Sequence, residues 1–163
     1  MEQYLPILVV IALVGAGLVS GLLFAFSNFV MQALGELPAE FGQLAMQRIN
    51  VRIINPGFFL AFMGTAAVCL AVVVLCVLSL GTAGAGWLLA GALAYLVGPV
   101  GITVAFNVPL NNALAAATRE QAGMAWPTYA KRWLRWNHAR TFLGVLAIAL
   151  LGYGLPRLPG TGA

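Results

Sequence analysis

The chain has few charged side chains and few side chains that could ligate a metal. Only 7% of its 163 residues are charged, none is aspartate, and the sequence holds one histidine and two cysteines. Soluble domains carry about 25% charged residues, so this composition excludes a soluble globular domain. Cys69 and Cys76 are about two helical turns apart, roughly 10 Å, which is too far for a disulfide and disfavours a thiol-disulfide enzyme. The shortage of ligands excludes a tetrahedral zinc site, a multi-histidine copper site and a bis-histidine haem within one chain.

Apolar residues are abundant instead, at 62% of the chain, and they form long runs without charge. Residues 5–26 carry no charged side chain, and neither do residues 53–118, which the glycine-rich stretch 81–86 interrupts. About 20 apolar residues in a helix cross a bilayer, and a glycine-rich stretch predicts a turn. We therefore expect an all-α membrane protein, a single domain over residues 1–163, with four transmembrane helices at about residues 5–33, 56–80, 87–106 and 136–155.

Two polar segments lie between the predicted spans. Residues 36–54 and 129–140 mix apolar with polar and basic side chains, which predicts two amphipathic interfacial helices on one side of the membrane. Pro109, after the third span, is expected to disturb a continuing helix. Most basic residues fall on the side of these segments, so the positive-inside rule predicts that this side is cytoplasmic, in a bacterial inner membrane, and that both termini are external. The net charge of +4 suits an anionic lipid bilayer better than a nucleic acid.

A trace of an internal repeat is also present. Ala25-Phe26 and Ala33-Leu34 match Ala105-Phe106 and Ala113-Leu114, and Arg48-Ile49-Asn50 echoes Arg135-Trp136-Asn137. These matches predict a two-fold internal repeat whose pseudo-axis runs along the membrane normal. Small residues on the spans also permit close helix packing and a homodimer.

The stretch 133–141 concentrates the polar and aromatic chemistry of the chain. Read as a helix, it places Trp133, Asn137 and Arg140 on one stripe, with His138 about a quarter turn away. Polar residues at the same ends of the other spans are expected to converge with them in a sheltered pocket, because buried amides need partners. The predicted pocket contains Asn50, Asn107, Asn111, Asn137, His138 and Arg140, under Trp133 and Trp136. The alternative is an aromatic belt at the headgroups and a histidine that only caps or hydrogen-bonds.

Several motifs resemble those of the anthrone oxygenase-like family of small integral membrane proteins. They run over nearly the whole chain: Phe26-Ser27-x-Phe29-Val30-Met31, Met46-Gln47-x-Ile49-Asn50, Asn55-Pro56, Asn107-Val108-Pro109-Leu110-Asn111 and Trp136-Asn137-His138-x-Arg140-Thr141. The sequence departs from many members at Gln32, where they have proline, and at Asn112, where they have an acidic residue. The resemblance implies a fold of four spans. For fungal members it also implies oxidation of an anthrone to an anthraquinone by molecular oxygen.

If the substrate is an anthrone, the residues of the predicted pocket can be given expected roles. The benzylic proton of an anthrone is acidic, and the anion that remains can pass an electron to oxygen without a metal, so no cofactor is expected besides oxygen as co-substrate. His138 would be the base, and Asn137 and Arg140 would stabilise the oxyanion as the other catalytic residues. Substrate would be bound by the amides and indoles of Asn50, Asn107, Asn111, Trp133 and Trp136.

Two other functions stay open. The first is a non-enzyme that binds or transports a small hydrophobic molecule, or serves as a partner subunit. The second is a haem or metal protein that uses His138 across a dimer.

Overall fold

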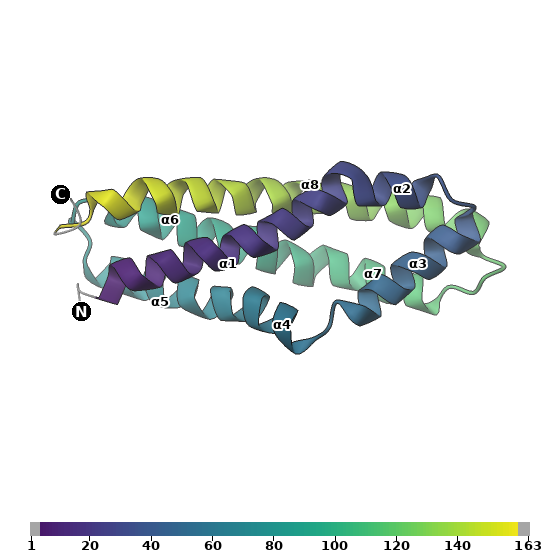
Figure 1. Cartoon of the computed structure of the whole chain (residues 1–163), viewed down its shortest axis with the longest axis horizontal. Helices are drawn as coiled ribbons and strands as arrows, with labels where there is room; N and C mark the ends of the chain where they lie inside the picture. The colour runs from purple at the N-terminus through teal and green to yellow at the C-terminus, as the bar shows by residue number, and fades with distance from the viewer. Residues whose placement is uncertain (1–3, 160–163) are drawn as a thin grey trace.

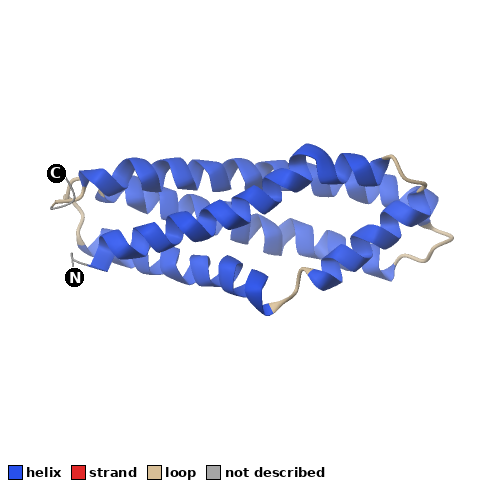
Figure 2. Cartoon of the chain, in the orientation of Figure 1, coloured by secondary structure: helices blue, strands red, loops and turns tan. Residues whose placement is uncertain are grey.

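The structure is a computed structural model that describes residues 4–159, and within that range it consists of helices joined by short loops, without a strand (Figures 1 and 2). The start of the first helix, at Leu5, and the end of the last, at Arg157, lie at the same end of an elongated bundle, as an even number of crossings requires (Figure 1). Four helical stretches are long and apolar enough to cross a membrane: Leu5–Gly35, Pro56–Leu78, Ala85–Ala116 and Ala122–Arg157. The prediction of an all-α protein with four transmembrane helices is therefore confirmed.

Each stretch is made of consecutive helical segments. The first contains α1 (Leu5–Ala25), the π-helical turn η2 (Phe26–Val30) and α2 (Met31–Gly35), and α3 (Ala39–Arg52) follows it. The second contains α4 (Pro56–Phe59), the π-helical η3 (Leu60–Gly64) and α5 (Thr65–Leu78). The third contains α6 (Ala85–Tyr95), the π-helical η4 (Leu96–Asn107) and α7 (Val108–Ala116). The fourth is α8 (Ala122–Gly154) with the 3₁₀ turn η5 (Leu155–Arg157).

The third and fourth helices extend well beyond their predicted ends. The third continues to Ala116, although residue 106 was the expected end, and α8 begins at Ala122. Residues 129–140 are consequently not a separate helix, because α8 runs through them without a break. The helix α3 occupies the other polar segment, but the interfacial position of that segment and the internal repeat remain predictions.

Pro109 does not end the third helix because a π-helical segment precedes it. Pro109 is at the start of α7, and Pro99 lies within η4. Proline lacks the N–H that an α-helix needs, and the wider hydrogen-bonding pattern of a π-helix accommodates such interruptions. The carbonyl of Pro99 accepts a 2.5 Å hydrogen bond from the hydroxyl of Thr103. The distortion thus fixes a polar side chain in the middle of an apolar span.

Close approach between helices depends on small residues. A Cβ atom added to Gly98 would lie 2.3 Å from the Cβ of Leu143 in α8, and one added to Gly144 would lie 2.3 Å from the hydroxyl oxygen of Ser20 in α1. Without a hydrophobic driving force inside lipid, such van der Waals contact is a main source of helix association. These two glycines therefore set how closely α8 packs against η4 and α1.

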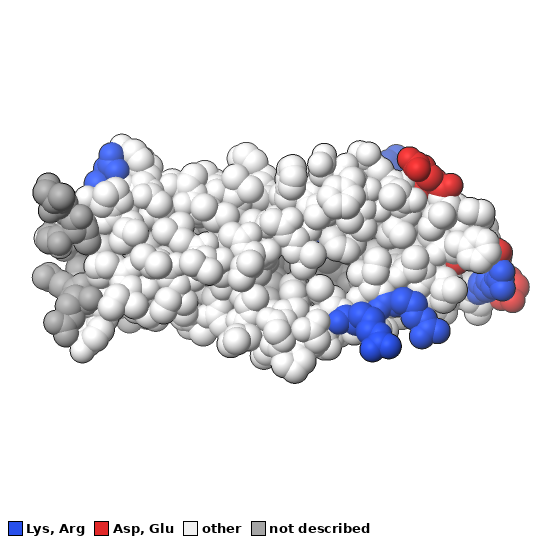
Figure 3. All heavy atoms as spheres, in the orientation of Figure 1, with Lys and Arg blue, Asp and Glu red and all other residues white. Residues whose placement is uncertain are grey.

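The end of the bundle away from the termini has a second apolar core and holds most of the charge. Met31, Met46, Leu114, Trp126, Tyr129 and Trp133 are buried together there, between α2, α3, α7 and α8. Most charged side chains visible on one face gather at this end, some basic atoms show at the opposite end, and the long middle of that face carries none (Figure 3). Arg119 forms a 2.8 Å salt bridge with Glu40, and its hydrogen bond and charge lower the pKa of the Glu40 carboxyl.

Two glutamine side chains of α3 form hydrogen bonds with the end of α7. The amide of Gln43 donates to the carbonyls of Ala117 and Thr118, at 3.1 Å each, and the amide of Gln47 donates to the carbonyl of Leu114 at 2.8 Å. These carbonyls lie at or just beyond the end of α7, where the α-helical N–H four residues later is missing. From the backbone, the carbonyls of Leu114 and Thr118 accept only turn hydrogen bonds, from the N–H groups of Ala117 and Gln121. The side-chain amides thus add donors at this helix end and join α3 to the end of α7.

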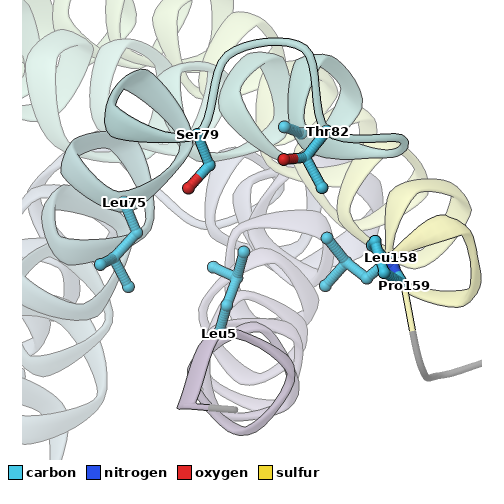
Figure 4. Close-up of a pocket in the computed structure, with 7 residues that line it drawn as sticks. Leu5, Leu75, Ser79, Thr82, Leu158 and Pro159 are labelled. Atoms are coloured by element: carbon cyan, nitrogen blue, oxygen red, sulfur yellow. The ribbon is translucent and has the colours of Figure 1, made fainter. Parts of the chain in front are cut away.

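The opposite end of the bundle, near the termini, encloses only a small cavity. Its volume is about 30 Å³, about that of one water molecule, and it lies between the start of α1, the end of α5 and the turn after α5 (Figure 4). Its lining is Leu5, Leu75, Ser79, Thr82, Ala85, Leu158 and Pro159. An aromatic substrate cannot fit in this cavity. An open groove of about 590 Å³ at the same end has no polar side chain in its lining, which is Pro6, Ile7, Val10, Ile11, Leu155 and Pro156. The polar end is therefore the better place to look for a site.

Candidate functional site

One pair of side chains on α8 forms the centre of the polar cluster. The guanidinium of Arg140 donates from Nε and Nη2 to the amide oxygen of Asn137, at 3.0 and 2.7 Å. The two residues are three apart, so a helix places them on the same face. Asn137 is fully buried and Arg140 is 7% exposed, so the pair is sheltered within the bundle.

Asn137 also ties α8 to the first helix. Its amide nitrogen donates to the carbonyl of Leu23 and to the hydroxyl of Ser27, each at 2.8 Å. Ser27 lies in η2 and is in turn 3.2 Å from the hydroxyl of Thr141. The asparagine therefore uses its oxygen for Arg140 and its nitrogen for α1, which fixes its orientation.

Arg140 has neutral partners only. Besides Asn137, it donates from Nη1 to the hydroxyl of Thr103 at 2.7 Å, and its guanidinium carbon lies 5.0 Å from the centre of the Trp133 ring. Within residues 4–159 the only salt bridge joins Arg119 to Glu40, so no described carboxylate neutralises Arg140. A buried cation in an apolar region is costly unless it is paired, and it marks a functional site by default.

Trp133 supplies a second donor at the same place. Its ring packs against Phe26 at 5.6 Å and against Tyr129 at 6.4 Å, and its indole N–H is buried without an acceptor among the described residues. The amide of Asn107 donates to the backbone carbonyl of Trp133 at 3.3 Å, while its own oxygen is buried and unpaired. Unsatisfied buried groups are rare and call for an explanation, of which a missing ligand is one.

Tyr129 connects the two remaining predicted asparagines. Its hydroxyl donates to the amide oxygen of Asn111 at 2.9 Å and accepts a long 3.5 Å hydrogen bond from the amide of Asn50. Tyr129 is buried, and it lies one helical turn before Trp133 on α8. The structure therefore places Asn50, Asn107, Asn111, Trp133, Asn137 and Arg140 in one cluster that extends from the polar end toward the middle of the bundle, on α3, η4, α7 and α8.

His138 and Trp136 are placed differently. His138 is exposed on the outer side of α8 and makes no hydrogen bond with the described residues, because it precedes Arg140 by two positions, about 200° around the helix. Trp136 stacks on Phe106, with ring centres 3.6 Å apart and planes 6° apart, so one face of its indole is already covered. The roles predicted for both residues remain predictions, and neither side chain belongs to the cluster around Arg140.

Three members of the cluster were not selected from the sequence as site residues: Ser27, Thr103 and Tyr129. Tyr129 had a usable signal, since it extends the stripe of Trp133 and Asn137 by one turn. Ser27 and Thr103 had none, because single hydroxyls in apolar spans occur commonly without a role in a site.

The cluster is equipped to bind a negatively charged oxygen. Arg140 still has N–H donors to spare, and the free indole N–H of Trp133 lies beside it. Charge-assisted hydrogen bonds from a guanidinium are among the stronger ones in proteins, and a dry surrounding strengthens them further. Within residues 4–159 no group of three histidine, cysteine or acidic side chains could hold a metal ion.

Comparison with protein families gives one result. The model of the family described as anthrone oxygenase matches residues 58–150, which is more than half of the chain. The match covers the part of the cluster on η4, α7 and α8, and leaves out Ser27 and Asn50. Comparisons with curated proteins and with solved structures found no match.

Proposed function

The chain belongs to the anthrone oxygenase family, and we propose that it oxidises a hydrophobic, anthrone-like aromatic compound with molecular oxygen, at a site organised by Arg140. The overall reaction would convert the ring methylene of an anthrone to a carbonyl. One molecule of oxygen is consumed, one oxygen atom enters the product, and the other leaves as water together with the two methylene hydrogens.

The first chemical step would be loss of a methylene proton. The electron pair that remains is delocalised onto the existing carbonyl oxygen, so the anion resembles a phenolate. This electron-rich anion reduces oxygen and forms a carbon–oxygen bond with it, and loss of water from the resulting hydroperoxide gives the second carbonyl. The protein's main task is therefore to favour the anion.

Arg140 is the observation that carries this proposal. It is a buried cation in an apolar bundle, with amide, hydroxyl and aromatic partners but no described carboxylate. A fixed positive charge beside the substrate oxygen stabilises the anion more than the neutral ketone, and this difference lowers the barrier to proton loss. The unpaired indole N–H of Trp133 would donate to the same oxygen.

The surroundings suit a flat, apolar substrate. Phe26, Tyr129 and Trp133 form a group of aromatic rings beside the guanidinium, against which a polycyclic ring would pack well. An open groove of about 350 Å³, lined by Tyr129, Leu110 and Leu114, lies beside this cluster. A compound of this kind dissolves in the bilayer and would approach from there. We propose that the charged end of the bundle faces the cytoplasm, in accord with the positive-inside rule.

The test is oxygen consumption by the purified protein with an anthrone, followed together with quinone absorbance. Arg140→Gln should lower turnover by about 100- to 1000-fold, as loss of one oxyanion donor does in other enzymes. Arg157→Gln, which removes an arginine at the opposite end of α8, is the matched control. Equal turnover by Arg140→Gln and the native protein would remove Arg140 from the mechanism. Binding of anthrone without oxygen uptake would favour a binding or transport protein instead.

A further inference from the structure

The outer side of α8 carries a basic groove that the proposed reaction does not use. Lys131, Arg132, Leu134, Arg135 and His138 line an open depression of about 400 Å³. Residues 131, 135 and 138 follow one another at helical spacings of four and three, so one side of the helix presents them together. We call these five residues the basic groove.

The cations of the basic groove lack partners among the described residues, as Arg48 and Arg52 on α3 also do, but three of them line one depression. Arg119 is paired with Glu40, Arg140 with Asn137, and Arg157 donates to the carbonyl of Tyr153. Lys131, Arg132 and Arg135 are exposed and form no hydrogen bond or ion pair with residues 4–159. The helix α8 itself contains no acidic residue. Three permanent positive charges therefore share one depression without a counter-charge.

The position of the basic groove along α8, relative to the bilayer, indicates which group could neutralise its positive charges. Arg135 and Arg157 are separated by 22 positions along the last helical stretch, Ala122–Arg157. At about 1.5 Å per residue this separation is about 33 Å, close to the thickness of the hydrocarbon core of a bilayer. With Arg157 at one border of the hydrocarbon, Arg135 reaches the other, and Lys131 and Arg132 lie just beyond it. The groove is thus at the level of lipid phosphates.

We propose that the basic groove binds the headgroup of an anionic phospholipid. Lys131, Arg132 and Arg135 would donate to the phosphate oxygens, and Leu134 would lie against the upper part of an acyl chain. His138, on the hydrocarbon side of Arg135, would contact the glycerol region. This site is distinct from the cluster around Arg140, which faces the inside of the bundle, so it does not depend on the proposed reaction.

The experiment measures lipid retention by native mass spectrometry, with the full chain offered equal amounts of phosphatidylglycerol and phosphatidylcholine. The double variant Arg132→Gln/Arg135→Gln should retain about twentyfold less phosphatidylglycerol than the native protein, given the contribution of each basic residue near an anionic surface. The matched control is Arg48→Gln/Arg52→Gln, which removes two exposed arginines from α3 and should change retention by less than about threefold.

Three results would overturn the proposal: native retention by Arg132→Gln/Arg135→Gln, an equal loss in both double variants, or displacement of the lipid by millimolar inorganic phosphate. An equal loss would mean that only diffuse charge matters, and displacement by phosphate would make the groove a site for free anions. Cross-linking of the native protein with a photoreactive phosphatidylglycerol gives the same answer without a variant. Adducts should map to residues 131–138, and adducts spread evenly over α3 and α8 would contradict the site.

Discussion

Arg140 and Asn137 are held together by two hydrogen bonds, from Nε and Nη2 of the guanidinium to a single amide oxygen. The asparagine thereby orients the arginine, while its own amide nitrogen is anchored to the carbonyl of Leu23 on another helix. The position of the cation is thus set by contacts between α1 and α8. A site built in this way should respond to changes in helix packing as well as to changes at Arg140.

Asn137→Ala should destabilise the fold. The change removes the bonds to Leu23 and Ser27 and leaves the buried guanidinium with fewer partners, so we expect a loss of about 3 kcal/mol in the free energy of unfolding. Unfolding in mixed micelles with increasing SDS, followed by circular dichroism, measures this value. Asn28→Ala is the control, because Asn28 is exposed and should change the unfolding free energy by less than about 0.5 kcal/mol. Equal values for the two variants would show that Asn137 does not join the helices.

The four spans could be predicted from the sequence because lipid imposes a simple requirement on composition and length. The ends of the third and fourth helices could not, since they continue past the hydrocarbon into segments where hydropathy carries no signal. Residues 107–116 contain Pro109 and three asparagines, which suggest an interruption, yet the third helix continues there after the π-helical η4. Only the three-dimensional packing shows that α3 and α8 support this extension.

Only the part of the candidate site that lies on one helix could be predicted from the sequence. Residues on one helix, such as Trp133, Asn137 and Arg140, have a fixed angular relation, and the structure buries all three on one face. Partners on other spans depend on rotation and depth of packing, so Ser27 and Thr103 could not be identified as acceptors and donors. The same angular argument places His138 away from that face, and the expectation that it joins the pocket gave too little weight to the helix geometry.

Gly98→Ala should weaken the packing between η4 and α8. The added Cβ would meet the Cβ of Leu143 at 2.3 Å, which backbone movement must relieve, and such overpacking costs about 1–3 kcal/mol. Gly17→Ala in α1 provides the control, since nothing lies within 4 Å of the added atom. There the better helix propensity of alanine should stabilise the protein by up to about 1 kcal/mol. The midpoints of SDS-induced unfolding should therefore move in opposite directions, and shifts of the same sign would contradict the close packing.

Glu40→Gln should remove a small, pH-dependent contribution to the stability of the fold, which comes from the salt bridge at the charged end. The hydrogen bond from Arg119, followed by its charge, lowers the pKa of Glu40 from the ordinary 4.5. A carboxyl with a lowered pKa in the folded state stabilises the fold above its unfolded pKa, and this contribution disappears as pH falls through the folded pKa. The native protein should therefore melt slightly above Glu40→Gln near neutral pH, and the two melting temperatures should converge as the pH falls through the lowered pKa of Glu40.

The control for that prediction is Glu36→Gln, because Glu36 is exposed and forms no salt bridge within residues 4–159. Its melting temperature should follow that of the native protein across the same pH range. The pair of Glu40 and Arg119 lies at the surface, so high salt should also reduce the difference between native protein and Glu40→Gln. A difference that persists at acid pH would assign the effect to packing rather than to charge.

His138→Gln tests the base that the sequence suggests. The side chain is exposed and has no hydrogen-bond partner within the described residues, so the melting temperature of this variant should equal that of the native protein. If the imidazole removes the substrate proton, turnover of an anthrone should fall by about 100- to 10,000-fold at unchanged stability, and added imidazole should restore part of it. Turnover within a few-fold of native, beside a large loss in Arg140→Gln, would instead mean that the buried guanidinium makes the substrate acidic enough for water to accept the proton. Anthrone oxidation by the two variants and the native protein, measured in one preparation of the same detergent, decides between these mechanisms.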